Sequence, residues 1–278
     1  MKLYSIPDYH IHTTLCKHAT GSMEEYVEHS INTGLAEIGF SDHMPLMPEP
    51  KFCMGFDDLK RYADSVREMQ QRYDGRIIIR FGCEMDMVFE RLDEAARIIE
   101  DYEFDYVIGS IHYLEDWPFD QVEYSDVFEK GNIERIYENF FDTIIHAAES
   151  GLYDITGHID NIKRMGYRPD GDSTETYERV AGVLKAMDCT VEVNMSGIDT
   201  AAGEPYPSPA FLKILCRHDV PVTVGSDAHS PDQTGRYFDR AVDYLHDAGY
   251  THAAFFSGRK RVLKSIGQSF SGEGVSSG

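Results

Sequence analysis

The feature that most constrains the fold is a regular alternation of two kinds of segment. Short apolar runs fit β-strands, and each run is followed by a longer segment whose apolar residues recur at helical spacing. The expected strands cover residues 3–12, 35–40, 76–81, 104–108, 152–156, 190–193 and 221–224. Strands that alternate with helices pair in parallel, because each helix carries the chain back across the sheet. The sequence therefore predicts an α/β protein built on a parallel sheet.

The helical segments carry their own start and stop signals. Ser22 and Glu25 are spaced as in a capping box, and Gly34 follows as a stop signal. The expected helices cover residues 22–34, 57–73, 91–100, 127–149, 173–186, 209–217 and 236–247, and a short apolar run at 253–256 completes the order. No shift in composition marks a second domain, so residues 1–268 are expected to form one domain. The Gly/Ser-rich tail, 269–278, is expected to be disordered.

Polar residues follow every expected strand. In an open parallel sheet the ligand site lies at one switch point, whereas in a barrel all the strand ends meet at one face. The even distribution of polar residues therefore favours a closed or distorted (β/α) barrel over an open sheet.

Histidines are concentrated at these strand ends. Seven of the twelve lie at or just beyond them: His10, His12, His18, His43, His112, His158 and His229. Barrel closure would bring them to one face together with Asp42, Glu84 and Asp227. The other five are interpreted as surface or packing histidines: His29, His146, His218, His246 and His252.

Such a cluster favours a metal centre. His10 and His12 are two residues apart, so in a strand both rings leave the same face. Imidazoles and carboxylates crowded into one pocket repel charges of their own sign unless cations bind them. Nitrogen and oxygen donors fit two or three divalent transition-metal ions, namely Zn²⁺, Mn²⁺ or Fe²⁺. The alternative is that these side chains are separate hydrogen-bonding groups at the strand ends.

The composition limits the partners and the compartment. Asp and Glu outnumber Lys and Arg by 48 to 26, and the formal charge of −22 disfavours binding to nucleic acid or to an anionic membrane. There is no signal-peptide pattern and no apolar run of about 18 residues, as a membrane span needs. The five cysteines contain no C-x-x-C pair, so neither a disulfide framework nor a cysteine zinc site is indicated. We expect a cytoplasmic protein that is a monomer or a small homo-oligomer.

Six short motifs follow the strands in order: Asp8-x-His10-x-His12, Ser41-Asp42-His43, Gly82-Cys83-Glu84, Gly109-Ser110-Ile111-His112, Gly157-His158 and Gly225-Ser226-Asp227-Ala228-His229. Together they resemble the ordered motifs of the PHP (polymerase and histidinol phosphatase) superfamily. Within it, segments 12–19, 104–114 and 204–208 are similar to the PHP-type histidinol-phosphate phosphatases. The resemblance extends over residues 3–257 and implies a distorted (β/α)₇ TIM-like barrel with a trinuclear metal centre.

The resemblance also implies a distribution of ligands among three ions. The first ion would be held by His10, His12, Glu84 and Asp227, the second by Glu84, His112 and His158, and the third by His18, His43 and His229. Glu84 would thus bridge two ions. The catalytic candidates are Asp227, Glu84 and Asp42. A nucleophilic aspartate stays open, but Asp227 fits the role of a ligand better. Asp8 and Asp42 would orient ligands or handle protons.

Clustered cations favour the hydrolysis of a phosphate ester. A water molecule activated by the ions attacks phosphorus in line, while the ions neutralise the phosphoryl oxygens and the leaving group. The resemblance implies that the enzyme is a phosphoric monoester hydrolase of histidine biosynthesis, which converts L-histidinol phosphate to L-histidinol and phosphate. The expected partner is therefore a small phosphorylated metabolite.

Two loops supply candidate substrate contacts. Lys163, Arg164 and Arg168 follow the fifth strand and are candidates for binding the phosphate. Glu115 and Trp117 follow the fourth strand and are candidates for recognising the ammonium and imidazole groups.

One position departs from the family pattern. Asp199 stands where histidinol phosphatases of this type usually have a basic residue, and it would repel phosphate unless it is turned away or paired. Another small phosphorylated metabolite or a phosphodiester therefore remains open as the substrate. A non-catalytic, metal-binding PHP module is a further alternative.

Overall fold

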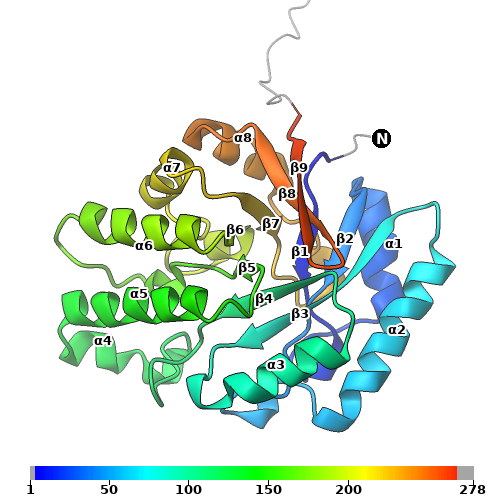
Figure 1. The fold of residues 1–278 in the computed structure, drawn as a ribbon, viewed down its shortest axis with the longest axis horizontal. Helices are drawn as coiled ribbons and strands as arrows, with labels where there is room; N and C mark the ends of the chain where they lie inside the picture. The colour runs from blue at the N-terminus through cyan, green and yellow to red at the C-terminus, as the bar shows by residue number, and fades with distance from the viewer. Residues whose placement is uncertain (1–3, 268–278) are drawn as a thin grey trace, which may run out of the picture.

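A computed structural model describes residues 4–267 and contains a seven-stranded parallel sheet curled into a barrel (Figure 1). The strands are β1 (Asp8–Ile11), β2 (Glu37–Phe40), β3 (Ile78–Asp86), β4 (Tyr106–Ser110), β5 (Ile155–Thr156), β6 (Thr190–Asn194) and β7 (Val222–Gly225). They lie side by side in chain order, as expected when each helix returns the chain to the next strand. The predicted α/β barrel is confirmed. The expected tail, 269–278, lies outside the described residues.

The barrel is closed by a short contact between its first and last strands. Just after β7, Ala228 donates its backbone N–H to His10 and accepts one from His12, at 3.0 and 2.9 Å. Because the pairing is limited to this stretch, the barrel is distorted rather than regular. The closure places the residues that follow β7 directly beside those of β1.

Helices surround the strands on the outside (Figure 1). The α-helices are α1 (Met23–Thr33), α2 (Leu59–Arg72), α3 (Leu92–Asp101), α4 (Asp126–Lys130), α5 (Ile133–Glu149), α6 (Thr174–Ala186), α7 (Pro209–Arg217) and α8 (Phe238–Ala248). Short 3₁₀ helices are η1 (Thr14–Cys16), η2 (Pro50–Phe52), η3 (Phe56–Asp58), η4 (Phe89–Arg91), η5 (Val122–Tyr124), η6 (Asn161–Lys163), η7 (Met195–Asp199) and η8 (Pro231–Gln233). Helix α2 is typical, because Tyr62, Val66 and Met69 lie on one face and are buried against the sheet.

The barrel interior explains why β3 differs from its prediction. The sequence places the end of this strand at residue 81, before Gly82, but the strand continues to Asp86. The Tyr106 ring lies against Gly39 and Gly82, and a β-carbon on either glycine would overlap it. Gly82 therefore lies within the strand and leaves room for the Tyr106 ring, rather than marking the end of the strand. As a result Glu84 belongs to the strand itself.

The predicted helix at 127–149 is also wrong, because the chain breaks between α4 and α5. Gly131 ends α4, and a β-carbon there would lie 2.7 Å from the Val127 carbonyl oxygen. Asn132 then caps α5 by accepting the backbone N–H of Arg135 at 2.8 Å. A glycine followed by an N-cap residue is thus sufficient to separate the two helices.

A hairpin of β8 (His252–Ser257) and β9 (Lys260–Ser265) lies against the amino-terminal ends of the central strands. Arg259 at its turn donates to Asp154, immediately before β5, at 2.8 Å. Strand β9 is not predicted from the sequence, because its charged and exposed residues lack an apolar face. The hairpin leaves the opposite, carboxyl-terminal end of the barrel open for a site. Within residues 4–267, no helix has both the length and the apolar character needed to cross a membrane.

Candidate metal centre

The seven histidines predicted at the strand ends lie together at the carboxyl end of the barrel. The His12 ring is central, with its centroid 4.0 Å from that of His229, 4.4 Å from that of His43 and 5.0 Å from that of His10. The remaining rings continue the cluster, since His18 lies 4.7 Å from His229, and His112 and His158 lie 5.0 Å apart. Parallel strand pairing therefore gathers residues that are up to 219 positions apart in the chain.

Glu84 lies at the middle of this cluster and is almost fully buried. Its Oε2 is 2.9 Å from His43 Nδ1, 3.2 Å from His10 Nε2 and 3.5 Å from His12 Nε2. Its Oε1 is 3.1 Å from His158 Nε2 and 3.7 Å from His112 Nε2. One carboxylate thus faces two groups of imidazoles, as a bridging ligand would.

Asp227 faces the imidazoles around Glu84 Oε2 from the other side. Its Oδ1 is 3.2 Å from His12 Nε2 and 3.5 Å from His229 Nδ1. The backbone of Asp227 has a φ of +53°, which is uncommon for a residue other than glycine. Arg236 supports this conformation by donating to the carbonyl oxygens of Ser226 and Asp227, at 2.7 and 2.8 Å.

The third group consists of His18, His43 and His229, of which His18 is the most exposed. The Nε2 atoms of His18 and His229 lie 2.9 Å apart. Partial burial and the neighbouring His43 lower the pKa of His18 to about 4. Burial and the neighbouring His12 lower the pKa of His229 as well. The neutral form, which is the form of imidazole that binds metal, is thus favoured for both rings.

Further carboxylates orient the histidine rings from behind. Glu192 Oε1 lies 2.6 Å from His10 Nδ1, and Asp86 Oδ1 lies 2.8 Å from His112 Nδ1. These contacts turn the Nε2 atom of each ring toward Glu84. Neither Glu192 nor Asp86 is predicted from the sequence as a site residue. A carboxylate within the apolar run of β6 was the available signal for Glu192, and a spacing of two from Glu84 was the signal for Asp86.

The two aspartates expected to orient ligands differ in their surroundings. Asp42 Oδ1 lies 3.5 Å from His12 Nδ1, and its Oδ2 accepts the Thr13 hydroxyl. Asp8 instead accepts backbone N–H groups from Ser226 and Gly235, at 2.9 and 2.8 Å. Burial raises the pKa of Asp8 to about 6. Asp42 therefore supports a histidine ring, whereas Asp8 ties β1 to the loop after β7.

The donor atoms fit a metal centre. Several buried ring nitrogens and carboxylate oxygens make no hydrogen bond with the described residues: His10 Nε2, His12 Nε2, His43 Nδ1 and Glu84 Oε2. Uncompensated buried polar atoms are costly, so their convergence indicates a cation as the missing partner. Three sets of ligand atoms, each within 4.8 Å of one another, support this: His10, His12 and Asp227; His12, His43 and Glu84; and His18, His43 and His229.

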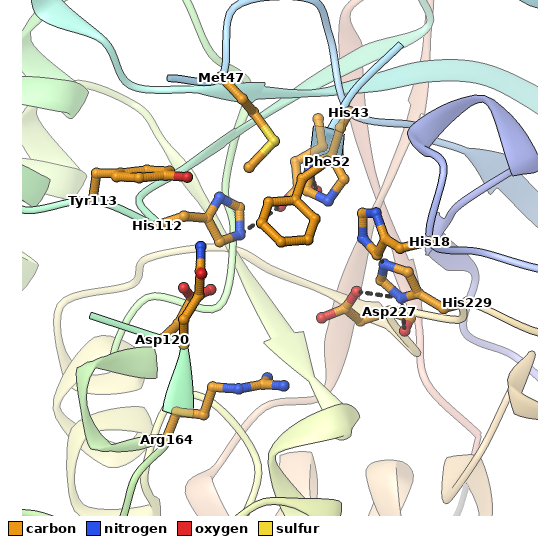
Figure 2. Close-up of a pocket in the computed structure, with 12 residues that line it drawn as sticks. His18, His43, Met47, Phe52, His112, Tyr113, Asp120, Arg164, Asp227 and His229 are labelled. Atoms are coloured by element: carbon orange, nitrogen blue, oxygen red, sulfur yellow. Dashed lines mark hydrogen bonds and ion pairs between the residues drawn. The ribbon is translucent and has the colours of Figure 1, made fainter. Parts of the chain in front are cut away.

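A cavity of about 410 Å³ opens over this centre (Figure 2). Besides the metal-ligand candidates its wall includes Met47, Phe52, Tyr113, Asp120, Gln121 and Arg164. In Figure 2, Asp120 and Arg164 lie on one side of the cavity, while His18, His229 and Asp227 lie on the other. The cavity size is that of a small-molecule site.

Of the three cations predicted to bind phosphate, only Arg164 lines the cavity. Lys163 is buried, and its Nζ donates to Asp160 Oδ2, Glu204 Oε1 and Pro205 O, at 2.9, 3.0 and 2.9 Å. Arg168 lies 3.0 Å from the same Glu204 oxygen. Glu204 thus engages both of these cations and leaves Arg164 without an ion-pair partner among the described residues.

The predicted contacts Glu115 and Trp117 lie beside a separate, shallow depression. Trp117 donates its Nε1–H to the Tyr124 carbonyl oxygen at 3.1 Å and packs on Phe128. Glu115 is exposed at the turn of this loop. Asp120 and Gln121, which follow later in the same loop, do line the cavity.

Asp199, the departure from the family pattern, is paired. Its Oδ2 lies 3.1 Å from Arg236 Nη1, and its Oδ1 accepts the Tyr237 hydroxyl. Arg236, from another part of the chain, thus compensates the negative charge of Asp199.

Comparisons with known proteins agree with this geometry. The family model described as the PHP domain matches residues 8–196. A probable histidinol-phosphatase of Deinococcus radiodurans is 33% identical over 245 residues, which cover 87% of this chain and 93% of that protein. A histidinol-phosphatase of Bacillus subtilis is 27% identical over 262 residues, with 85% and 98% covered.

Among solved structures, a histidinol phosphate phosphatase from Lactococcus lactis, complexed with zinc, L-histidinol and phosphate, has the same fold. Its TM-score is 0.80 at 23% identity, and the match covers 92% of this chain and 98% of that one. The family match, the near full-length relatives and the shared barrel lead to one conclusion. This chain belongs to the PHP domain family.

Proposed function

We propose that this chain is a metal-dependent phosphomonoesterase that hydrolyses L-histidinol phosphate to L-histidinol and phosphate. The observation that carries the proposal is a cluster of histidine and carboxylate atoms at the floor of a cavity. Several of these atoms make no hydrogen bond with the described residues, and Arg164 in the cavity wall has no ion-pair partner among them. The relatives named as histidinol-phosphatases match this chain over most of their length, which supports the substrate.

Two or three divalent ions, with Zn²⁺, Mn²⁺ and Fe²⁺ as candidates, would be held by three sets of residues. His10, His12, Glu84 and Asp227 form the first set, Glu84, His112 and His158 the second, and His18, His43 and His229 the third. When bound, such ions lower the pKa of water and neutralise charge on phosphoryl oxygens.

The protein's own side chains provide orientation and charge. Arg164 lines the cavity, and its guanidinium forms no ion pair within residues 4–267. A planar guanidinium can donate two parallel hydrogen bonds to a phosphate group. Asp42 is fully buried and is not part of the cavity wall, so we assign it to positioning His12 rather than to contact with substrate. Glu84 and Asp227 act as ligands that set the geometry of the floor.

Asp199 does not oppose this proposal. Its carboxylate is already engaged by Arg236 and Tyr237, so its charge is compensated at its own site. A phosphate ester in the cavity therefore meets Arg164, which is the one arginine or lysine among the described residues that line it. A different phosphorylated metabolite or a phosphodiester remains an outcome of the test.

The test is phosphate release from protein reconstituted with Zn²⁺ or Mn²⁺, with metal content measured on the same sample. L-histidinol phosphate is compared with phenyl phosphate and with an aryl phosphodiester. We expect kcat/KM for L-histidinol phosphate to be greater by about 100-fold or more, because contacts beyond the phosphate are each worth about tenfold when charged. Equal turnover of the monoesters, or a preference for the diester, would disprove the substrate assignment.

Two variants separate an enzyme from a metal-binding module. Glu84→Gln should abolish activity toward every substrate and lower the metal content. Arg164→Ala should lower kcat/KM by about 10- to 100-fold while metal content stays unchanged, because it removes a charged hydrogen bond to phosphate. Arg97→Ala, at an exposed position of α3, is the matched control.

A further inference from the structure

We propose that Asp120 selects the substrate by binding its ammonium group, an inference that rests on the proposed function and identifies the residue that gives it specificity. Asp120 lies in the loop after β4 and lines the same cavity as the metal-ligand candidates. It shares one side of that cavity with Arg164, which comes from the segment after β5 (Figure 2).

Asp120 differs from the other acidic residues around the centre because no other described residue donates a hydrogen bond to its carboxylate. Glu192, Asp86 and Asp42 each accept hydrogen bonds or lie against a histidine ring. Asp120 makes no hydrogen bond and no ion pair with any residue between positions 4 and 267, although it is half-buried. A carboxylate that is partly shielded from water and faces a cavity without a partner is suited to a ligand that brings a cationic donor.

The electrostatic surroundings of Asp120 are consistent with this role. Burial raises the pKa of Asp120, whereas the nearby His112 and Arg164 oppose that effect. Neither of these residues pairs with it directly. The carboxylate therefore lies in a mixed environment in which an additional positive charge would be stabilised at short range.

The cavity divides into regions that match the parts of L-histidinol phosphate. The phosphate belongs at the metal floor beside Arg164, and the ammonium at the carboxylate of Asp120. Phe52 and Met47 provide an apolar wall on which the imidazole ring can pack. The exposed Glu115, which the sequence suggested for the ammonium, lies beside the separate depression at the loop turn.

Kinetics of the metal-loaded enzyme test this assignment with two substrates that differ only in the ammonium group. These are L-histidinol phosphate and its deamino analogue, the phosphate ester of 3-(imidazol-4-yl)propanol. We expect the wild-type enzyme to prefer the first by about 10- to 100-fold in kcat/KM, mostly through KM. In Asp120→Asn the preference should fall to about onefold, while the analogue is turned over at a nearly unchanged rate.

The matched control is Asp116→Asn, which removes the same charge from an exposed position of the same loop. It should leave the preference between the two substrates intact. Metal content and the far-UV circular dichroism spectrum are measured for every variant. If Asp120→Asn fails to fold, the wild-type preference for L-histidinol phosphate over its deamino analogue still tests whether the enzyme recognises the ammonium group.

The outcomes are distinct. A wild-type enzyme that does not discriminate between the two substrates overturns the ammonium site, and so does an Asp120→Asn variant that retains the full preference. An equal loss for both substrates would assign Asp120 to the chemical step or to metal binding, and would overturn the inference as well. If the wild type hydrolyses phenyl phosphate but not L-histidinol phosphate, the proposed function itself is wrong. A direct binding measurement with L-histidinol, weaker by about tenfold in Asp120→Asn, would support the inference independently of turnover.

Discussion

Glu192 and His10 are both buried and meet beside Gly225, with 2.6 Å between Glu192 Oε1 and His10 Nδ1. The other oxygen, Oε2, accepts the backbone N–H of His158 at 2.8 Å. One buried carboxylate of β6 therefore fixes the ring of a candidate ligand on β1 and the backbone of another after β5. Gly225 of β7 makes room for it, because a β-carbon there would overlap the Glu192 carboxylate.

Glu192→Gln should weaken metal binding without unfolding the barrel. The amide keeps the shape of the side chain but loses the charge that holds the Nδ1 proton of His10, and changes of this kind lower metal affinity by about 10- to 100-fold. Affinity is measured by competition with a chromophoric chelator. Glu178→Gln removes a surface carboxylate paired with Arg217 and serves as the control. Unaltered affinity in Glu192→Gln would show that His10 is oriented without this carboxylate.

Gly225→Ala should disrupt the same contact from the opposite side. The added methyl group must displace Glu192 or His10, and overpacking of this kind costs about 1–3 kcal/mol. We expect a lower midpoint of thermal unfolding and reduced metal content. Gly182→Ala, in α6, meets no atom within 4 Å and should be neutral or stabilising by up to about 1 kcal/mol. If both variants unfolded at the wild-type temperature, the close packing around Glu192 would be disproved.

Removal of metal by a chelator should lower the thermal stability of the wild-type protein. The carboxylates of Glu84 and Asp227 and the surrounding imidazoles would lose the cations that compensate them, and a ligand at 100 times its Kd stabilises a fold by about 2.7 kcal/mol. Differential scanning calorimetry before and after chelation measures the effect, and added Zn²⁺ or Mn²⁺ should reverse it. In Glu84→Gln the chelator should have little effect. An equal chelator effect in both proteins would place the stabilising ions elsewhere.

Arg259→Ala should destabilise the opposite end of the barrel and leave kcat unchanged. Arg259 donates to Asp154 Oδ2 at 2.8 Å and to the Leu152 carbonyl oxygen at 2.7 Å. Because Asp154 is largely buried, loss of its partner should cost about 1–3 kcal/mol in chemical denaturation. Lys260→Ala, at the next residue of the hairpin, is the control. A loss of kcat in Arg259→Ala would contradict the separation of the hairpin from the site.

The Arg259→Ala defect should depend on pH. Burial raises the pKa of Asp154 and Arg259 opposes that shift, so its removal raises this pKa further. Above the usual carboxyl pKa, the folded variant then binds a proton that the unfolded chain has released, and its stability falls as pH rises. Denaturation at a series of pH values between about 4 and 8 should show the defect growing toward neutral pH. A defect independent of pH would indicate that Asp154 remains ionised without its partner.

Sequence patterns are enough to predict the class of the protein and which histidines and carboxylates gather at one face of the barrel. Apolar periodicity and local signals are short-range properties, and they place elements such as α7, whose Ser208 cap and Pro209 start mark its boundary. Parallel strands with polar residues at every end determine that the predicted histidines must meet at one face. The placement of helices depends on interactions within a few residues. The gathering of the histidines depends on the general rule that the carboxyl ends of parallel strands lie at the same face of a barrel.

Which polar groups compensate one another depends on the folded barrel and cannot be predicted from local sequence. Glu192 supports His10 from 182 positions away, and Arg236 compensates Asp199. Glu204 engages Lys163, whereas Arg164 has no ion-pair partner in the described part of the chain. Strand β3 also continues through Gly82, because the ring of Tyr106 from the neighbouring strand occupies the space that a side chain at this position would need. Such pairings depend on strand register, loop path and excluded volume, and these properties arise only when the barrel closes. For the same reason the cavity wall includes Asp120, whereas the exposed Glu115 of the same loop lies outside it.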